Sequence, residues 1–146
     1  MKKGLITALM AINASAFAAD LLISIEEMTA SNNSPPLFTA KSVPAKDAPV
    51  IALIAPKLTS PVTSPTVIEV KFQPAASSTV KPESFRVLYG SFEIDITKRI
   101  LSLTKVTETG VFVQEASLPK GKHKLLMVVE DSSGRKGNRT VEFEVQ

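Results

Sequence analysis

The sequence predicts an all-β domain in which two antiparallel sheets form a sandwich of about seven strands. Three observations lead to this prediction. After residue 49, short apolar runs recur at close spacing, the prolines fall between these runs, and no stretch has the period of a long helix. Short runs separated by turn residues are typical of β-sandwiches.

The end of the chain predicts a β-hairpin. In residues 139–145 the apolar side chains of Val141, Phe143 and Val145 alternate with polar ones, which is the period of a half-buried strand. Residues 123–130 form a second β-rich run. The polar segment between the two runs contains Asp131, Gly134, Gly137 and Asn138, and we expect it to form the turn of the closing hairpin.

Residues 1–18 have the features of a secretory signal peptide. Lys2 and Lys3 are followed by a short apolar run, and Ala16 and Ala18 have the A-x-A spacing that signal peptidase reads. A membrane anchor is the alternative, but the run is too short to span a bilayer comfortably. We expect cleavage after Ala18, or one residue later, no transmembrane span in the mature chain, and a bacterial periplasmic or extracellular location.

Charge and cysteine content exclude several classes of protein. The chain has 17 Lys and Arg against 14 Asp and Glu. Cleavage would remove two lysines and leave a net charge of +1, which is far below the charge of most nucleic-acid binders, so no nucleic-acid partner is expected. There is no Cys, so neither a lipoprotein anchor nor a disulfide is available, and stability must come from the core.

Residues 19–48 are expected to lie outside the sandwich, with docking of residues 21–29 on it left as an open alternative. A short helix is predicted within residues 21–29, with Ser24 as its N-cap and two glutamates in its first turn. The part from Asn32 to Ala48 is rich in proline and polar residues and predicts an extended linker. The folded domain is therefore expected at residues 49–146.

The strands of this domain are predicted from runs of β-forming residues between turn signals. Residues 98–109 suit either a helical turn or a short edge strand. In the run at residues 67–72, the side chains of Ile68, Val70 and Phe72 should face the core. The predicted strands are residues 50–55, 67–72, 84–89, 92–97, 110–116, 123–130 and 139–145.

Gly90-Ser91 predicts a two-residue hairpin turn in the middle of the domain. This turn would bring six large apolar residues onto one face and set Arg86 opposite Asp95, a pair that favours the register by up to ~1 kcal/mol. The predicted partners are Tyr89 with Phe92, Val87 with Ile94, and Phe85 with Ile96.

Four features of residues 49–146 resemble bacterial immunoglobulin-like and fibronectin-III-like domains. The L-P-x-G-x-H run at residues 118–123, the apolar strand after it, Asp131-x-x-Gly134-Arg135 and the final Phe143-x-Val145 are similar to their E–F turn, F strand, F–G turn and G strand. The resemblance implies an immunoglobulin-like sandwich and a bacterial envelope protein. It implies no ligand, and the absence of both cysteines and of Trp sets the chain apart from antibody domains.

Residues with catalytic or metal-binding chemistry are scarce in the sequence. His123 is the single histidine, and with no Cys or second His to join it we expect its ring to pack in the fold or to bond a backbone carbonyl. Asp131 is expected to accept hydrogen bonds from backbone N–H groups of its turn. No catalytic residue, metal site or cofactor is predicted.

One cluster of basic residues is a candidate binding site for an anion. In the usual sandwich topology, the loops that carry Lys98, Arg99, Arg135, Lys136 and Arg139 would gather at one end. The alternative is a scattered basic surface that serves solubility, because the opposite end would also hold lysines, at positions 57, 120, 122 and 124.

The sequence therefore predicts a non-enzymatic binding or structural module of the bacterial cell envelope. Its expected partner is an envelope protein, an anionic glycan or a lipid headgroup. A small β-sandwich hydrolase or metal-dependent enzyme is the first alternative. A periplasmic chaperone or inhibitor that pairs through an edge strand is the second, and a bare, long edge strand would be its sign.

Overall fold

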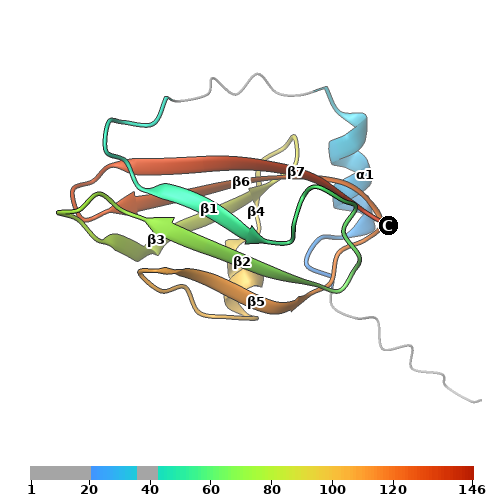
Figure 1. Ribbon diagram of the computed structural model, residues 1–146. Helices are drawn as coiled ribbons and strands as arrows, with labels where there is room; N and C mark the ends of the chain where they lie inside the picture. Colours follow the sequence, from blue (N-terminus) through green and yellow to red (C-terminus); the bar gives the residue numbers. More distant parts are fainter. Residues whose placement is uncertain (1–20, 36–42) are drawn as a thin grey trace, which may run out of the picture.

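The computed structural model describes residues 21–35 and 43–146 (Figure 1). The predicted leader at residues 1–18 lies outside these residues, as does Leu37-Phe38 of the expected linker. Seven strands and two short helices are present among the described residues. They are α1 (Ile25–Asn33), β1 (Val50–Ala55), β2 (Thr66–Gln73), β3 (Val80–Tyr89), β4 (Ile94–Asp95), α2 (Thr97–Leu101), β5 (Gly110–Ala116), β6 (Gly121–Asp131) and β7 (Lys136–Val145).

The strands form two antiparallel sheets, as predicted. The three-stranded sheet has the order β1-β2-β5, and the four-stranded sheet has the order β4-β3-β6-β7. Apolar side chains of both sheets belong to one core cluster. Phe72 of β2 and Phe85 of β3 meet across it with ring centroids 5.6 Å apart, so the two sheets pack face to face.

The alternation of side chains along the strands confirms the predicted faces. Val70 and Phe72 of β2 are buried, and Ile68 is packed against the core. In β7 Val141 and Val145 are buried while Glu142 and Glu144 are exposed. These strands are half-buried because one face of each sheet covers the core and the other meets solvent.

The predicted register of the middle hairpin is wrong by two residues. Tyr89 pairs with Ile94 and Leu88 with Asp95, so four residues, Gly90 to Glu93, make the turn. The Gly90 N–H donates to Lys124 O of β6, which continues the sheet past Tyr89, and the turn closes with Glu93 N donating to Gly90 O. Phe92 is consequently exposed rather than paired with Tyr89.

A shift of two residues leaves the other apolar side chains on their predicted face. Ile96 is fully buried and Ile94 packs against the core. Arg86 and Asp95 do not face each other, and Asp95 accepts a hydrogen bond from Thr97 N instead. The apolar pattern could not separate the two registers, because a shift by an even number of residues preserves the faces of a strand.

Two further strand predictions differ from the structure. Pro82 lies inside β3, at an irregularity where the pairing with β6 shifts between Lys81 and Arg86, which is where a sheet tolerates proline. The predicted strand at residues 92–97 is reduced to Ile94–Asp95. The chain then turns into α2, so the start of residues 98–109 is a helical turn.

The N-terminal segment, defined here as residues 21–34, is part of the fold. The helix begins after Ser24 as predicted, and Ser24 and Glu27 form a reciprocal capping box. The expectation that this region lies outside the sandwich is wrong. Leu22 and Ile23 are 4% and 0% exposed and belong to the core, and Leu22 N donates to Ser117 O at the end of β5.

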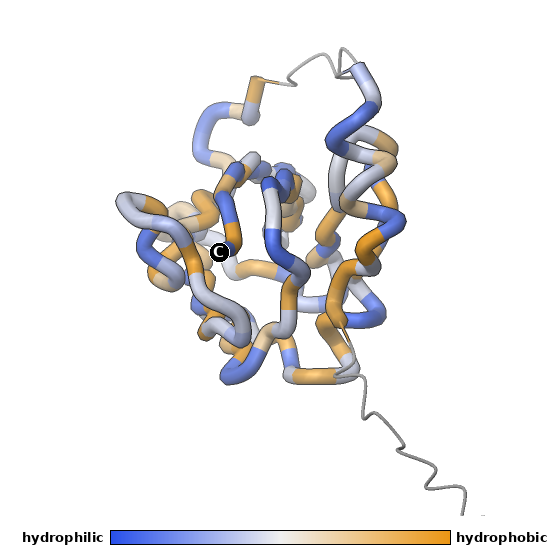
Figure 2. Tube along the Cα trace, turned by 90° about the vertical axis from the view of Figure 1, so that its right-hand side faces the viewer, coloured by the Kyte–Doolittle hydropathy of each residue, from blue (hydrophilic) through white to orange (hydrophobic). Residues whose placement is uncertain are grey.

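The N-terminal segment covers one end of the sandwich, opposite the β6–β7 turn (Figure 1). Figure 2 looks onto this end, with α1 at the upper right of the view. The sequence pattern hid the docking because only two consecutive apolar side chains enter the core, which gives no period of either kind.

Candidate functional site

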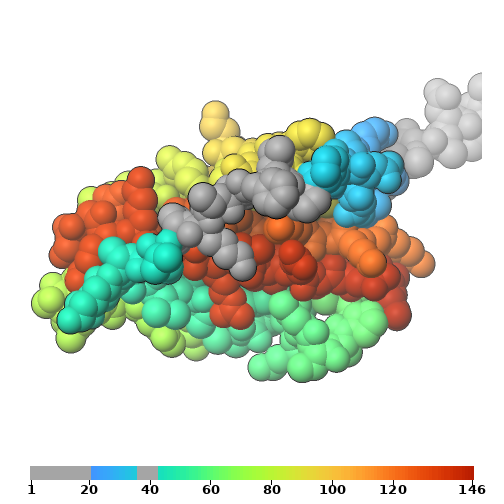
Figure 3. Space-filling model, turned by 90° about the horizontal axis from the view of Figure 1, so that it is seen from above, coloured from blue at the N-terminus to red at the C-terminus, as the bar shows by residue number. Residues whose placement is uncertain are grey.

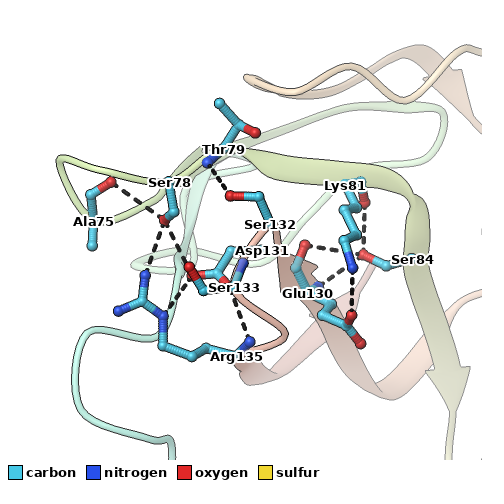
Figure 4. Close-up of polar contacts among 10 residues, drawn as sticks. All are labelled: Ala75, Ser78, Thr79, Lys81, Ser84, Glu130, Asp131, Ser132, Ser133 and Arg135. Carbon is cyan, nitrogen blue, oxygen red and sulfur yellow. Dashed lines mark hydrogen bonds and ion pairs between the residues drawn. The ribbon is translucent and has the colours of Figure 1, made fainter.

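Two residues of the predicted anion site, Arg135 and Lys136, lie together at the turn between β6 and β7. The carboxylate of Asp131 stabilises this turn through hydrogen bonds (Figure 4). Asp131 is fully buried, and its Oδ1 accepts hydrogen bonds from the backbone N–H groups of Ser133 and Arg135 at 3.0 and 2.9 Å. This confirms the predicted role of Asp131 in its turn.

The guanidinium of Arg135 closes over the same carboxylate. Its Nε donates to Asp131 Oδ2 at 2.8 Å, and its terminal nitrogen donates to the Ser78 hydroxyl, which in turn donates to Asp131 Oδ2. Burial acts to raise the pKa of Asp131, but the hydrogen bonds from Arg135 and Ser78 outweigh it and hold the pKa below its usual value. Arg135 is therefore engaged in the fold and is a poor anion ligand.

Lys136 lies on the outer face of the same end, opposite Glu130. Glu130 also forms an ion pair with Lys81 of β3, in which Lys81 Nζ donates to Glu130 Oε1 at 2.9 Å (Figure 4). Lys81 lowers the pKa of Glu130 through this hydrogen bond, and the charge of Lys136 acts in the same direction. Two ammonium groups thus flank Glu130. Glu83 and Asp131 also act on Lys81, and Arg135 is paired with Asp131, so the cations and anions at this end are equal in number.

The side chain of Arg139 contacts β1 of the other sheet rather than the β6–β7 turn. It sits in β7 opposite Met127, three residues from the Glu130–Lys136 pair, or about 10 Å along the strand. Its guanidinium donates to Ile51 O of β1 at 3.1 Å. Arg139 therefore satisfies a backbone acceptor on the edge of the three-stranded sheet.

Lys98 and Arg99 lie beyond the opposite edge of the four-stranded sheet. They follow Thr97, whose hydroxyl accepts a hydrogen bond from Val87 N of β3, whereas Arg139 belongs to β7. Three inter-strand spacings, about 14 Å, separate β4 from β7. Arg99 bonds the carboxylate of Glu27 and also Leu22 O, both in the N-terminal segment.

The predicted convergence of five basic residues is thus not found. Arg135 and Lys136 lie together, Arg139 is about 10 Å away, and Lys98 and Arg99 belong to the side that holds the N-terminal segment. The predicted convergence followed from the usual topology of the sandwich alone. The carboxylates of Glu27 and Asp131 hold two of the three guanidinium groups, those of Arg99 and Arg135, in other directions.

His123 is buried inside the other end of the molecule, 3% exposed. Its Nε2 lies 2.8 Å from Pro119 O, its Nδ1 lies 2.9 Å from the Tyr89 hydroxyl, and its ring stacks on Phe143. A carbonyl only accepts, so Nε2 carries the hydrogen and Nδ1 accepts from Tyr89. The predicted bond to a backbone carbonyl is confirmed, and the Tyr89 partner was not foreseen.

A small apolar hollow opens between the sheets near the end of β1. Its volume is about 30 Å³, close to the share of one water molecule in liquid water. Such a space admits a methyl-sized group rather than a whole small molecule, whose pockets measure about 300–1,000 Å³. The lining residues are Leu53, Pro56, Thr66, Ile68, Leu118, Leu125, Met127, Val141 and Phe143.

Within residues 21–35 and 43–146, no group of three or more His, Cys, Asp or Glu side chains is placed to hold a metal ion. Neither helix in this part of the chain is long and apolar enough to cross a membrane. Every buried side-chain nitrogen and oxygen of the described residues has a hydrogen-bond partner. The buried polar groups are therefore used in holding the fold together.

Comparison with protein-family models gave no match for this chain. Comparison with curated protein sequences gave none either.

Proposed function

We propose that the chain is an exported, non-enzymatic module of the bacterial cell envelope, built as an immunoglobulin-like or fibronectin-III-like sandwich that binds or supports a partner. The observation that carries the proposal is the order of the strands, β1-β2-β5 in one sheet and β4-β3-β6-β7 in the other. Named A to G in sequence order, the strands divide as A-B-E and D-C-F-G. The constant-type immunoglobulin division is A-B-E-D and C-F-G, so six strands agree with it and the fourth, β4, lies in the other sheet.

The use of the buried polar residues favours binding over catalysis. His123 and Asp131 are the most chemically capable of the buried side chains, and both are fully occupied by structural hydrogen bonds. A general base needs a free position within hydrogen-bond reach of its substrate. These two residues offer none in the folded chain.

The contacts along the sheet edges weigh against the edge-pairing alternative. Arg139 donates to Ile51 O on the edge strand β1, and the Thr104 hydroxyl donates to Phe112 O on the edge strand β5. At the end of the edge strand β7, Val62 N donates to Glu144 O, and Val62 O accepts from Gln146 N. A side chain that already bonds an edge carbonyl competes with an incoming strand.

For the anion-binding part of the proposal, the candidate residues are Lys136 and Lys81 at the β6–β7 end. Lys136 makes no ion pair within 4.0 Å among the described residues, and Lys81 shares Glu130 with it. An exposed pair of this kind attracts anions weakly, and salt screens it. The ligand class remains an anionic glycan or headgroup.

Two measurements test the proposal. The full chain is expressed in a bacterium and the envelope fraction is analysed by intact mass, which should show a chain beginning at Ala19 or Asp20; an uncleaved mass contradicts export.

The second measurement tests anion binding: purified protein is eluted from a dextran-sulfate resin with salt. Lys136→Glu should elute at lower salt than the wild type, and Lys120→Glu, in the loop before β6, is the charge-matched control. Equal elution of the two variants contradicts binding at the β6–β7 end.

A further inference from the structure

The N-terminal segment is held against the sandwich at two places, and both adjoin the hydrogen bonds of His123. At the end of β3, Ser91 N donates to the Ser31 hydroxyl, and the Ser91 hydroxyl donates to Ser31 O. At the beginning of β6, Asn32 donates to Lys122 O, and Met28 packs so closely on Gly121 that a Cβ there would lie 2.8 Å from its sulfur. Figure 3 shows α1, in blue, seated between these two regions.

The ring of His123 links the same two regions from inside. Tyr89, which donates to Nδ1, directly precedes the turn that holds Ser31. Pro119, which accepts from Nε2, lies in the loop between Ser117 and Gly121, and Ser117 O accepts from Leu22 N. Tyr89 and Pro119, the two hydrogen-bond partners of the ring, therefore belong to the two stretches of chain that contact the N-terminal segment.

A proton on Nδ1 breaks this arrangement. The protonated ring has two donors and no acceptor, so the Tyr89 hydroxyl loses the acceptor for its hydrogen. Tyr89 cannot respond by ionising, because burial, with the charge of Glu27 in addition, raises the pKa of Tyr89 to about 12. A charged imidazole would also be buried beside Phe143 without a counter-ion.

The charged groups around the ring do not offset this cost. Lys122 and Lys124 lie on the outer face of β6, and Glu142 and Glu144 lie on the outer face of β7. From α1 the carboxylate of Glu27 is already paired with Arg99 of α2. From β3 the group that faces His123 is Tyr89 itself.

We propose that the N-terminal segment is a pH-sensitive latch, docked while the ring of His123 is neutral and released when Nδ1 takes a proton. Release uncovers the apolar seat of Leu22 and Ile23 at the end of the sandwich. An exported chain shares the pH of its surroundings, so the latch would respond to acid outside the cell, but the titration itself does not depend on export.

The direction of the pH dependence follows from proton linkage. Burial lowers the pKa of His123 below its ordinary 6.5, against the smaller opposing effect of the bond to Pro119 O. The docked form then binds fewer protons than the released form, in which the ring regains water. Docking is therefore strongest above pH 6.5, and the released population rises up to tenfold for each unit of pH below it.

The acid range of the test separates His123 from the ion pair on the same segment. Arg99 lowers the pKa of Glu27 from 4.5 to about 2. Between pH 7 and pH 5, Glu27 therefore remains ionised in the docked form and is still about three-quarters ionised at pH 5 in the released form, which changes the docking equilibrium by at most about 1.3-fold. A change in docking over this range reports on His123.

The test is hydrogen exchange of the full chain, followed amide by amide with NMR between pH 7 and pH 5 and corrected for the intrinsic pH dependence of exchange. The chain has one His and one Tyr, so the signals of both partners are unambiguous. We expect the opening of α1 to increase up to tenfold per unit fall in pH, in step with the His123 titration, while β2 remains protected. A flat response of α1, or an equal loss of protection in β2, overturns the proposal.

His123→Gln is the matched variant, because its amide retains one donor for Pro119 O and one acceptor for Tyr89 but does not titrate. We expect it to keep α1 docked and to reduce the pH dependence of opening to less than twofold. A slope equal to that of the wild type overturns the proposal.

Tyr89→Phe is the second variant, for use if the Gln variant fails to fold. Without the hydroxyl of Tyr89 the ring of His123 should take its proton at higher pH, so the opening of α1 should also begin at higher pH. An unchanged pH midpoint of α1 opening counts against the latch.

Discussion

The guanidinium of Arg99 and the carboxylate of Glu27 make two hydrogen bonds of 2.7 Å, which join α2 to α1. The two residues are 72 positions apart in the sequence. Their bidentate contact ties the N-terminal segment to the sandwich, and it removes Arg99 from the basic end to which the sequence analysis assigned it.

Glu27→Gln should lower the free energy of unfolding by about 1 kcal/mol at pH 7, because the Glu27–Arg99 pair is bidentate but only partly buried. Gln retains the capping box with Ser24, so the change isolates the ion pair. The pKa of Glu27 is lowered, and the pair therefore stabilises the fold above pH 4.5 and loses its effect as pH falls toward about 2. Urea unfolding at pH 7 and pH 2.5 should show the gap between variant and wild type closing in acid; an equal gap at both pH values contradicts this account.

Ile23→Ala should destabilise the chain by about 2–5 kcal/mol, since the side chain is fully buried in the core. Ile25→Ala, two residues away on a side chain that is 56% exposed, should change the free energy of unfolding by less than about 0.5 kcal/mol. Thermal unfolding of both variants measures the contrast. Similar small effects would mean that residues 21–34 lie outside the cooperative unit.

Arg135→Met should lower the melting temperature clearly more than Lys136→Met. The first change leaves the buried carboxylate of Asp131 without its cationic partner, and the second removes an ammonium from the surface. Adjacent positions with the same substitution make the comparison direct. If the two variants melt together, Arg135 is a surface residue and returns to the candidate anion site.

Phe92→Ser should leave stability within about 0.5 kcal/mol, because Phe92 is 54% exposed in the four-residue turn. Ile96→Ala, at a fully buried position, should cost about 2–5 kcal/mol. The register with a two-residue turn makes the opposite prediction for Phe92, which would then pack against Tyr89. Chemical denaturation of the two variants distinguishes the registers.

Much of the strand layout was predictable from local pattern. β1 and β5 have the predicted bounds, and β2, β6 and β7 differ from the prediction by one to three residues at their ends. Alternation of apolar and polar side chains depends on which face of a strand meets the core, and that information is present in a few consecutive residues. The N-cap of α1 was predictable for a similar reason, since Ser24 and Glu27 interact within one turn.

The candidate site was far less predictable, because its contacts join distant parts of the chain. Asp131 and Arg135 are four residues apart and form a turn pattern that sequence analysis recognises, but the Ser78 hydroxyl that joins them lies 53 residues away. The Tyr89–His123 bond spans 34 residues. A lone histidine in a β-rich run does not reveal which side chain will face it across the sheet.

By itself, the sequence determined the class of fold, the inward faces of most strands and the position of the helix cap, because each of these follows from local periodicity or from contacts within one turn. Only the tertiary structure decided the register of β3 and β4, the docking of Leu22 and Ile23, and the partner of each basic residue. A shift of two residues leaves every face unchanged, and a charged side chain bonds whichever partner the packed sheets bring within reach. These choices depend on the packing of whole elements, which no short stretch of sequence contains.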